Sequence, residues 1–136
     1  METQTKTPVN LVQELIAIHT TRKEAVEKFS GQENPENLTS DLTAAGQQSD
    51  KFIAELMSEL SNFGDAVQAE VDRENDYQLT WKNTLGAIDT MNEQEKSRTF
   101  EQMEQNLKKF YQTMLDTSTE LPVSLQDILQ RQMKEL

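Results

Sequence analysis

His19 is the only histidine of the chain, and Arg22 follows it by three residues. An imidazole can bind a metal ion or transfer a proton near neutral pH. The spacing places both side chains on one helical face, in line with apolar residues such as Leu15 and Val26. A lone histidine on an apolar face is more often a packed, hydrogen-bonded residue than a ligand. We therefore expect His19 in the core and Arg22 paired with a glutamate of the helix predicted over 92–117.

Four glutamates could approach the interior and share a cation. They are Glu24, Glu55, Glu101 and Glu104. Carboxylate oxygens suit hard divalent cations, but two of these acids are followed four residues later by a lysine, the spacing of ordinary surface ion pairs. No nucleophile, oxyanion donor or orienting group accompanies them, so we predict no enzyme and no catalytic residue. The metal hypothesis concerns Glu24, Glu101 and Glu104, with iron or manganese as the only cofactors considered.

The chain carries 24 acidic and 13 basic residues, a formal net charge of −11. A phosphate backbone or an anionic membrane surface repels such a chain, so we expect no nucleic-acid and no membrane partner. The absence of cysteine excludes thiol catalysis, disulfides and Cys-based zinc sites. The first residues lack a signal-peptide pattern, and no apolar run approaches the roughly 20 residues of a membrane helix. We expect a soluble cytoplasmic protein.

Helical spacing of apolar residues divides the chain into helices. We predict a disordered tail over 1–7 and one all-α domain over 8–136. Its helices are expected over about 8–30, 34–64, 92–117 and 122–136, with a partly helical crossover over 65–90. Asn34 should accept an amide hydrogen bond at the start of the second helix, and Asn92 with Glu95 has the spacing of a capping box. The long crossover allows the helices on its two sides to lie parallel.

The first helix carries more apolar surface than one helix contact needs. A second stripe lies beside the first and consists of Leu11, Leu15, Ile18 and Ala25. Residual apolar faces of this kind favour a homodimer formed through helix faces. Trp81, the single tryptophan, is expected to anchor the crossover onto the bundle.

Short pieces of sequence along the chain occur in the order found in a known family. They are Val12 to Ile18, NPENL at 34–38, FIAEL at 52–56, Trp81, Glu101 and Glu104, Tyr111, and LP at 121–122 followed by LQRQ. Through them the chain resembles a poorly characterised family of bacterial proteins that carry a domain of unknown function. The resemblance implies a ferritin-like four-helix bundle with a long, partly helical crossover between helices two and three.

Ferritin-like di-metal sites take a Glu from each of two helices and a Glu-x-x-His from each of the other two. This sequence contains no Glu-x-x-His, and it carries Gln48, Gln130 and Gln132 where the family pattern leads us to expect acids. An amide supplies no anionic charge to an iron ion. The resemblance therefore implies a degenerate metal site, with Glu24, Glu101 and Glu104 as the remaining ligands.

Three functional hypotheses follow from these features. The first is a non-enzymatic structural or interaction protein that forms a homodimer through helix faces; the sequence names no other protein partner. The alternative is a carboxylate-bridged iron protein that binds or oxidises the metal. The third is a carrier of a lipid or small molecule, for which Ser49, Gln48 and His19 would form a polar layer at mid-bundle.

Overall fold

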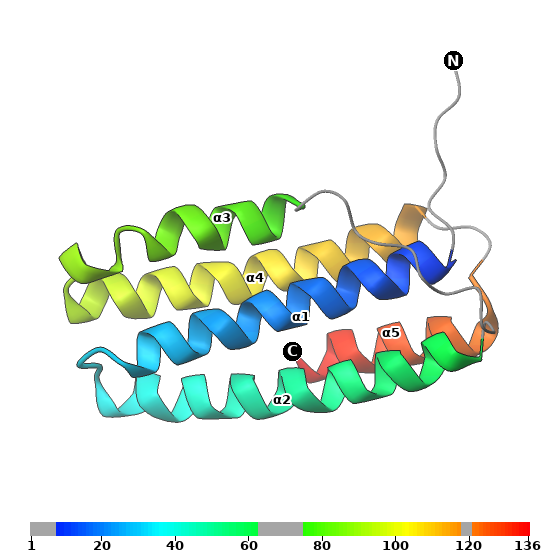
Figure 1. Ribbon diagram of the computed structural model, residues 1–136, viewed down its shortest axis with the longest axis horizontal. Coiled ribbons are helices and arrows are strands. Elements are labelled where there is room, and N and C mark those ends of the chain that lie inside the picture. Colours follow the sequence, from blue (N-terminus) through cyan, green and yellow to red (C-terminus); the bar gives the residue numbers. More distant parts are fainter. Residues whose placement is uncertain (1–7, 63–74, 118–120) are drawn as a thin grey trace, which may run out of the picture.

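The computed structural model describes residues 8–62, 75–117 and 121–136. These residues form five α-helices and one short 3-10 helix and contain no strand, which confirms the all-α prediction. The elements are α1 (Pro8–Ser30), α2 (Glu36–Ser61), α3 (Asp76–Leu85), η1 (Ile88–Thr90), α4 (Glu93–Thr117) and α5 (Val123–Glu135) (Figure 1). None of the described helices combines the length and apolar character needed to cross a membrane. The tail predicted over 1–7 lies outside the described residues.

Three long helices run the length of the molecule, and two short helices cover opposite halves of it (Figure 1). α1 and α2 are antiparallel, whereas α2 and α4 run in the same direction, as the long connection between them allows. α3 packs against one half of α1 and α4. α5 packs against the other half of α2 and α4. Beyond the end of α5, the facing sides of α2 and α4 therefore continue without another described helix between them.

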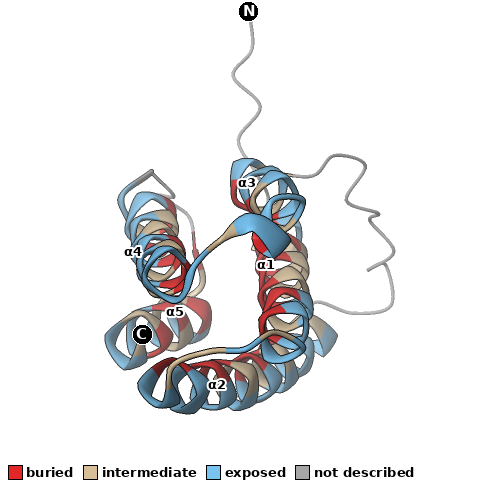
Figure 2. Cartoon of the chain, turned by 90° about the vertical axis from the view of Figure 1, so that its left-hand side faces the viewer, coloured by how far each residue is buried: buried red, intermediate tan, exposed pale blue. Residues whose placement is uncertain are grey.

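The core lies between the inward faces of these helices, where buried residues are concentrated (Figure 2). The second apolar stripe of α1 belongs to this core. Leu11, Leu15, Ile18 and Ala25 are each at most 3% exposed. α1 packs against α2 and α3, so the second apolar stripe of α1 is covered within a single chain. The expectation that this stripe remains free for a second copy was wrong. The homodimer itself stays a prediction.

Asn34 does not cap α2. Its side-chain amide instead donates to the backbone oxygens of Phe29 at 2.6 Å and Gln32 at 3.1 Å. Pro35 occupies the N-cap position of α2 without a side-chain cap hydrogen bond, and the helix begins at Glu36. The capping prediction for Asn34 was wrong: its NH2 group donates to carbonyl groups at and just beyond the end of α1, and its Oδ1, the atom that would cap α2, has no hydrogen-bond partner among the described residues.

The crossover is partly helical, as predicted, over its described part. α3 begins with a capping box in which Gln78 N–H donates to Asn75 Oδ1 at 2.9 Å and Asn75 N–H donates to Gln78 Oε1 at 3.1 Å. Trp81 is fully buried and meets Phe29 edge to face, with 5.7 Å between ring centroids. The indole N–H finds no acceptor among the described residues, so packing provides the anchor.

The capping box predicted at the start of α4 is present. Glu95 N–H donates to Asn92 Oδ1 at 2.8 Å, and Asn92 N–H donates to Glu95 Oε1 at 3.3 Å. We expect Asn92→Ala to lower the free energy of unfolding by about 1 kcal/mol, because it removes the acceptor of an otherwise unpaired helix amide. Urea denaturation followed by circular dichroism measures the loss. Asn92→Asp, which keeps an acceptor, and the neighbouring Gln94→Ala should each cost less than about 0.5 kcal/mol. An equal loss in Gln94→Ala would contradict the assignment.

Candidate functional site

α1 places two polar side chains in the interior, His19 at 0% and Arg22 at 1% exposure. Arg22 binds the carboxylate of Glu104 on α4 in a bidentate manner. Its Nε donates to Oε2 at 3.0 Å, and its Nη2 forms a short ion pair with Oε1. Nη1 donates to Ser49 Oγ of α2 at 3.1 Å. The predicted ion pair between Arg22 and a glutamate of the helix over 92–117 is confirmed. Its two-pronged geometry fixes the position of α1 relative to α4.

His19 continues these contacts towards α4 and α5. Its Nδ1 lies 3.0 Å from Ser49 Oγ, and its Nε2 lies 2.7 Å from Tyr111 Oη. The Tyr111 hydroxyl donates to Gln132 Oε1 at 2.7 Å, and Gln132 Nε2 donates to Glu55 Oε1 at 3.3 Å. We call this continuous set the interior network, and its members are Glu104, Arg22, Ser49, His19, Tyr111, Gln132 and Glu55. It connects α1, α2, α4 and α5.

Tyr111 fixes the direction of one hydrogen bond to His19. Its single hydroxyl proton goes to Gln132 Oε1, so its oxygen accepts from the Nε2–H of His19. Burial, with the nearby charge of Arg22, lowers the pKa of His19 to about 3, so the imidazole is neutral and carries its one proton on Nε2. Nδ1 of His19 then accepts from Ser49 Oγ–H.

The interior network presents no free reactive group. Both ring nitrogens of His19 are occupied by hydrogen bonds. Burial raises the pKa of Tyr111, so its hydroxyl stays protonated. An imidazole acts as a base or a metal ligand only through a nitrogen with a free lone pair. The prediction that His19 is a packed, hydrogen-bonded core residue is confirmed, and the geometry assigns the network to holding helices together.

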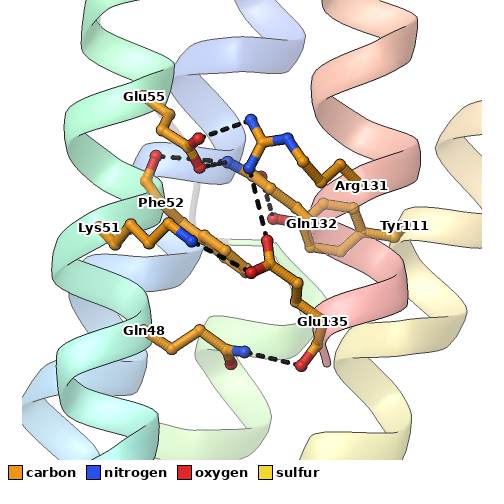
Figure 3. Close-up of polar contacts among 8 residues, drawn as sticks. All are labelled: Gln48, Lys51, Phe52, Glu55, Tyr111, Arg131, Gln132 and Glu135. Atoms are coloured by element: carbon orange, nitrogen blue, oxygen red, sulfur yellow. Dashed lines mark hydrogen bonds and ion pairs between the residues drawn. The ribbon is translucent and has the colours of Figure 1, made fainter.

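Polar contacts also hold α5 on α2 (Figure 3). Arg131 of α5 pairs with Glu55 of α2 at 2.5 Å, and Lys51 of α2 pairs with Glu135 of α5 at 3.1 Å. Gln48 Nε2 donates to the backbone oxygen of Glu135 at 2.8 Å. Partial burial alone would raise the pKa of Glu55, but hydrogen bonds from Arg131 and Gln132 hold it below its ordinary value. Glu55 is therefore an ionised acceptor at the end of the network.

A pocket of about 400 Å³ lies between α2 and α4, where α5 ends. We call it the α2–α4 groove. It is lined by Arg22 of α1, by Asn37, Leu38, Asp41, Ala44, Ala45 and Gln48 of α2, by Ser97, Phe100, Glu101 and Glu104 of α4, and by Glu135 and Leu136. The Arg22–Glu104 pair forms part of its inner wall, so the groove borders one end of the interior network.

The chain was compared with protein-family models, curated proteins and solved structures. None of the three comparisons finds a match. The described residues thus establish an all-helical protein of five helices, and the resemblance to a ferritin-like family stays a prediction.

The three predicted metal ligands are not gathered in one place. Glu101 and Glu104 both line the α2–α4 groove, where Glu104 is bound to Arg22. Glu24 is exposed on α1 and does not line the groove. Across residues 8–62, 75–117 and 121–136, no group of three or more His, Asp or Glu side chains is placed to hold a metal ion. These residues do not fit the di-metal centre that the resemblance implies.

The sequence alone did not indicate Tyr111 and Gln132 as partners of His19. A signal was available, because both fall on the inward faces of their helices and buried polar groups need hydrogen-bond partners. The polar layer expected from Ser49, Gln48 and His19 is confirmed for Ser49 and His19, which bond directly. Gln48 lies at the edge of the bundle and contacts α5 instead.

Proposed function

We propose that this chain is a non-enzymatic interaction protein built on a degenerate ferritin-like four-helix arrangement. The observation that carries the proposal is the position of Arg22. Its guanidinium lies in the interior and is shared by Glu104 and Ser49, so a fixed side-chain cation neutralises the carboxylate that a bound metal would otherwise need. The interior network offers no free base, nucleophile or set of metal ligands. We therefore place the function at the surface, where the protein would bind a partner.

The order of the helices supports the ferritin-like part of the proposal. α1 and α2 are joined by a short connection, α2 and α4 by a long one that contains α3, and α4 and α5 again by a short one. α2 and α4 run in the same direction (Figure 1). In such an arrangement, metal ligands project inwards from facing helices. Here the inward positions carry the interior network instead, which supports a scaffold whose metal chemistry is lost.

Metal analysis tests this proposal against its alternative, the carboxylate-bridged iron protein. Protein purified without chelator is analysed for iron and manganese, and Fe²⁺ is then titrated into the wild type, Glu104→Ala and Glu101→Gln while absorbance is followed. We expect no stoichiometric metal and no saturable response in any of them. Circular dichroism confirms that each variant is folded, and the exposed Glu101 provides a variant that should keep its stability. Near-stoichiometric metal that decreases in either variant would overturn the proposal.

A further inference from the structure

α3 and α5 are the two short helices of the bundle, and they are held in place in different ways. α5 has 13 residues and is tied to α2 and α4 by ion pairs and by hydrogen bonds of the buried Gln132. α3 has 10 residues. Its Gln78 Nε2 donates to Thr21 Oγ1 of α1 at 3.2 Å, and its Lys82 makes a further interaction. A helix of ten residues is marginal in water by itself, so α3 depends on its packing against α1 and α4.

Two aromatic side chains dock α3, and each carries a polar atom into the interior without a partner. Tyr77 is 4% exposed and Trp81 is fully buried. Trp81 lies close to the Tyr77 hydroxyl, yet neither this hydroxyl nor the indole N–H makes a hydrogen bond with any described residue. Water bonds both groups when the helix is undocked, so docking loses hydrogen bonds that it does not replace. This loss offsets part of the gain from burying the two rings, and α3 is therefore weakly held.

The region under α3 joins the aromatic core to the interior network. Trp81 packs edge to face against Phe29 of α1. Burial raises the pKa of the Tyr77 hydroxyl, on which the charges of Glu104 and Arg22 also act, so Tyr77 lies near the Arg22–Glu104 pair. Movement of α3 away from α1 and α4 therefore brings water to Phe29 and to this ion pair.

We propose that α3 is a cover that undocks from α1 and α4 while the other four helices stay packed. The undocked state keeps the interior network, because all members of the network lie on α1, α2, α4 and α5. It gives the Tyr77 hydroxyl and the Trp81 N–H to water and opens one side of the Arg22–Glu104 pair. Separate opening of this kind is typical of elements with few stabilising contacts. This motion goes beyond the proposed function and does not depend on it.

Native-state hydrogen exchange of the full chain tests the cover, with NMR detection in increasing urea below the unfolding transition. We expect backbone amides in the middle of α3 to exchange at least about ten-fold faster than those in the middle of α5, because α3 opens by itself. Their exchange rate should also depend only weakly on urea, since undocking of ten residues exposes far less surface than global unfolding. Equal rates with the same urea dependence in α3 and α5 would refute the separate opening of α3.

The same substitution at two tyrosines gives a matched pair of variants that keep the aromatic ring. Tyr77→Phe removes a hydroxyl without a partner, so it should slow exchange in α3 at least about five-fold and leave α5 unchanged. Tyr111→Phe removes a hydroxyl that bonds His19 and Gln132, so it should instead speed exchange in α5 at least about five-fold. Exchange in α3 that is unchanged or faster in Tyr77→Phe would mean that the Tyr77 hydroxyl is satisfied in the docked helix, and the proposal would be wrong.

Discussion

Replacing Glu104 with alanine should lower the free energy of unfolding by about 3 kcal/mol. The change leaves the Arg22 guanidinium, 2% exposed, without its carboxylate in the interior. The expected loss is at the lower end for a broken buried ion pair because the Glu104 side chain is 23% exposed and water reaches its side of the pair. Urea denaturation followed by circular dichroism gives the value.

Two further variants show whether the unpaired charge causes this loss. Glu104→Met combined with Arg22→Met replaces both charges by apolar side chains and should recover most of the stability, since no buried charge remains. Glu101→Ala, at the exposed acid three residues earlier on α4, should change stability by less than about 0.5 kcal/mol. A loss of less than about 1 kcal/mol in Glu104→Ala would show that the Arg22–Glu104 pair does not support the interior.

Acidification should destabilise the protein through His19 well before the carboxylates titrate. The pKa of His19 is about 3 in the folded chain and about 6.5 in the unfolded chain, where the imidazole is in water. Below pH 6.5 the unfolded chain binds a proton that the folded chain excludes, so stability is highest above pH 6.5 and falls as the pH decreases towards 3. Each pH unit costs about 1.4 kcal/mol, which amounts to about 2 kcal/mol between pH 6.5 and 5.

His19→Gln is the matched control, because glutamine offers one donor and one acceptor and does not titrate. Its stability should be nearly flat between pH 7 and 5, whereas that of the wild type falls. The single histidine also gives an unambiguous NMR signal, which should show a neutral Nε2–H imidazole at pH 5. A His19 pKa near 6.5, or the same pH dependence in both proteins, would contradict the buried neutral imidazole.

Much of the helical architecture could be predicted from the sequence because helix positions depend on local patterns. The capping box at Asn92 and the burial of Trp81 are examples, since each follows from residue types within one segment. Asn34 shows the limit of local reasoning. It has the right type and place to cap the next helix, but its NH2 group bonds carbonyls near the end of α1 and its Oδ1 makes no hydrogen bond to α2.

The candidate site was only half predictable, because its contacts join residues far apart in the chain. The placement of His19 and Arg22 on one inward face follows from helical spacing, and a buried arginine requires an acid. Which hydroxyl and which amide complete the hydrogen bonds depends on how α4 and α5 are rotated relative to α1, and spacing within one helix does not determine this. The α2–α4 groove depends on the same unknown, the position at which α5 ends along α2.

The interior network has a consequence for how the chain chooses one arrangement of its helices during folding. An apolar core of leucine, methionine and alanine tolerates a helix that slips by one turn, because one apolar side chain replaces another. Such a slip moves a helix by about 5.4 Å, and the hydrogen bonds around His19, 2.7 and 3.0 Å long, do not survive it. Each slipped arrangement leaves buried polar groups unpaired. The network therefore selects one register for α1, α2, α4 and α5 at once, and it can close only after the last of them has docked.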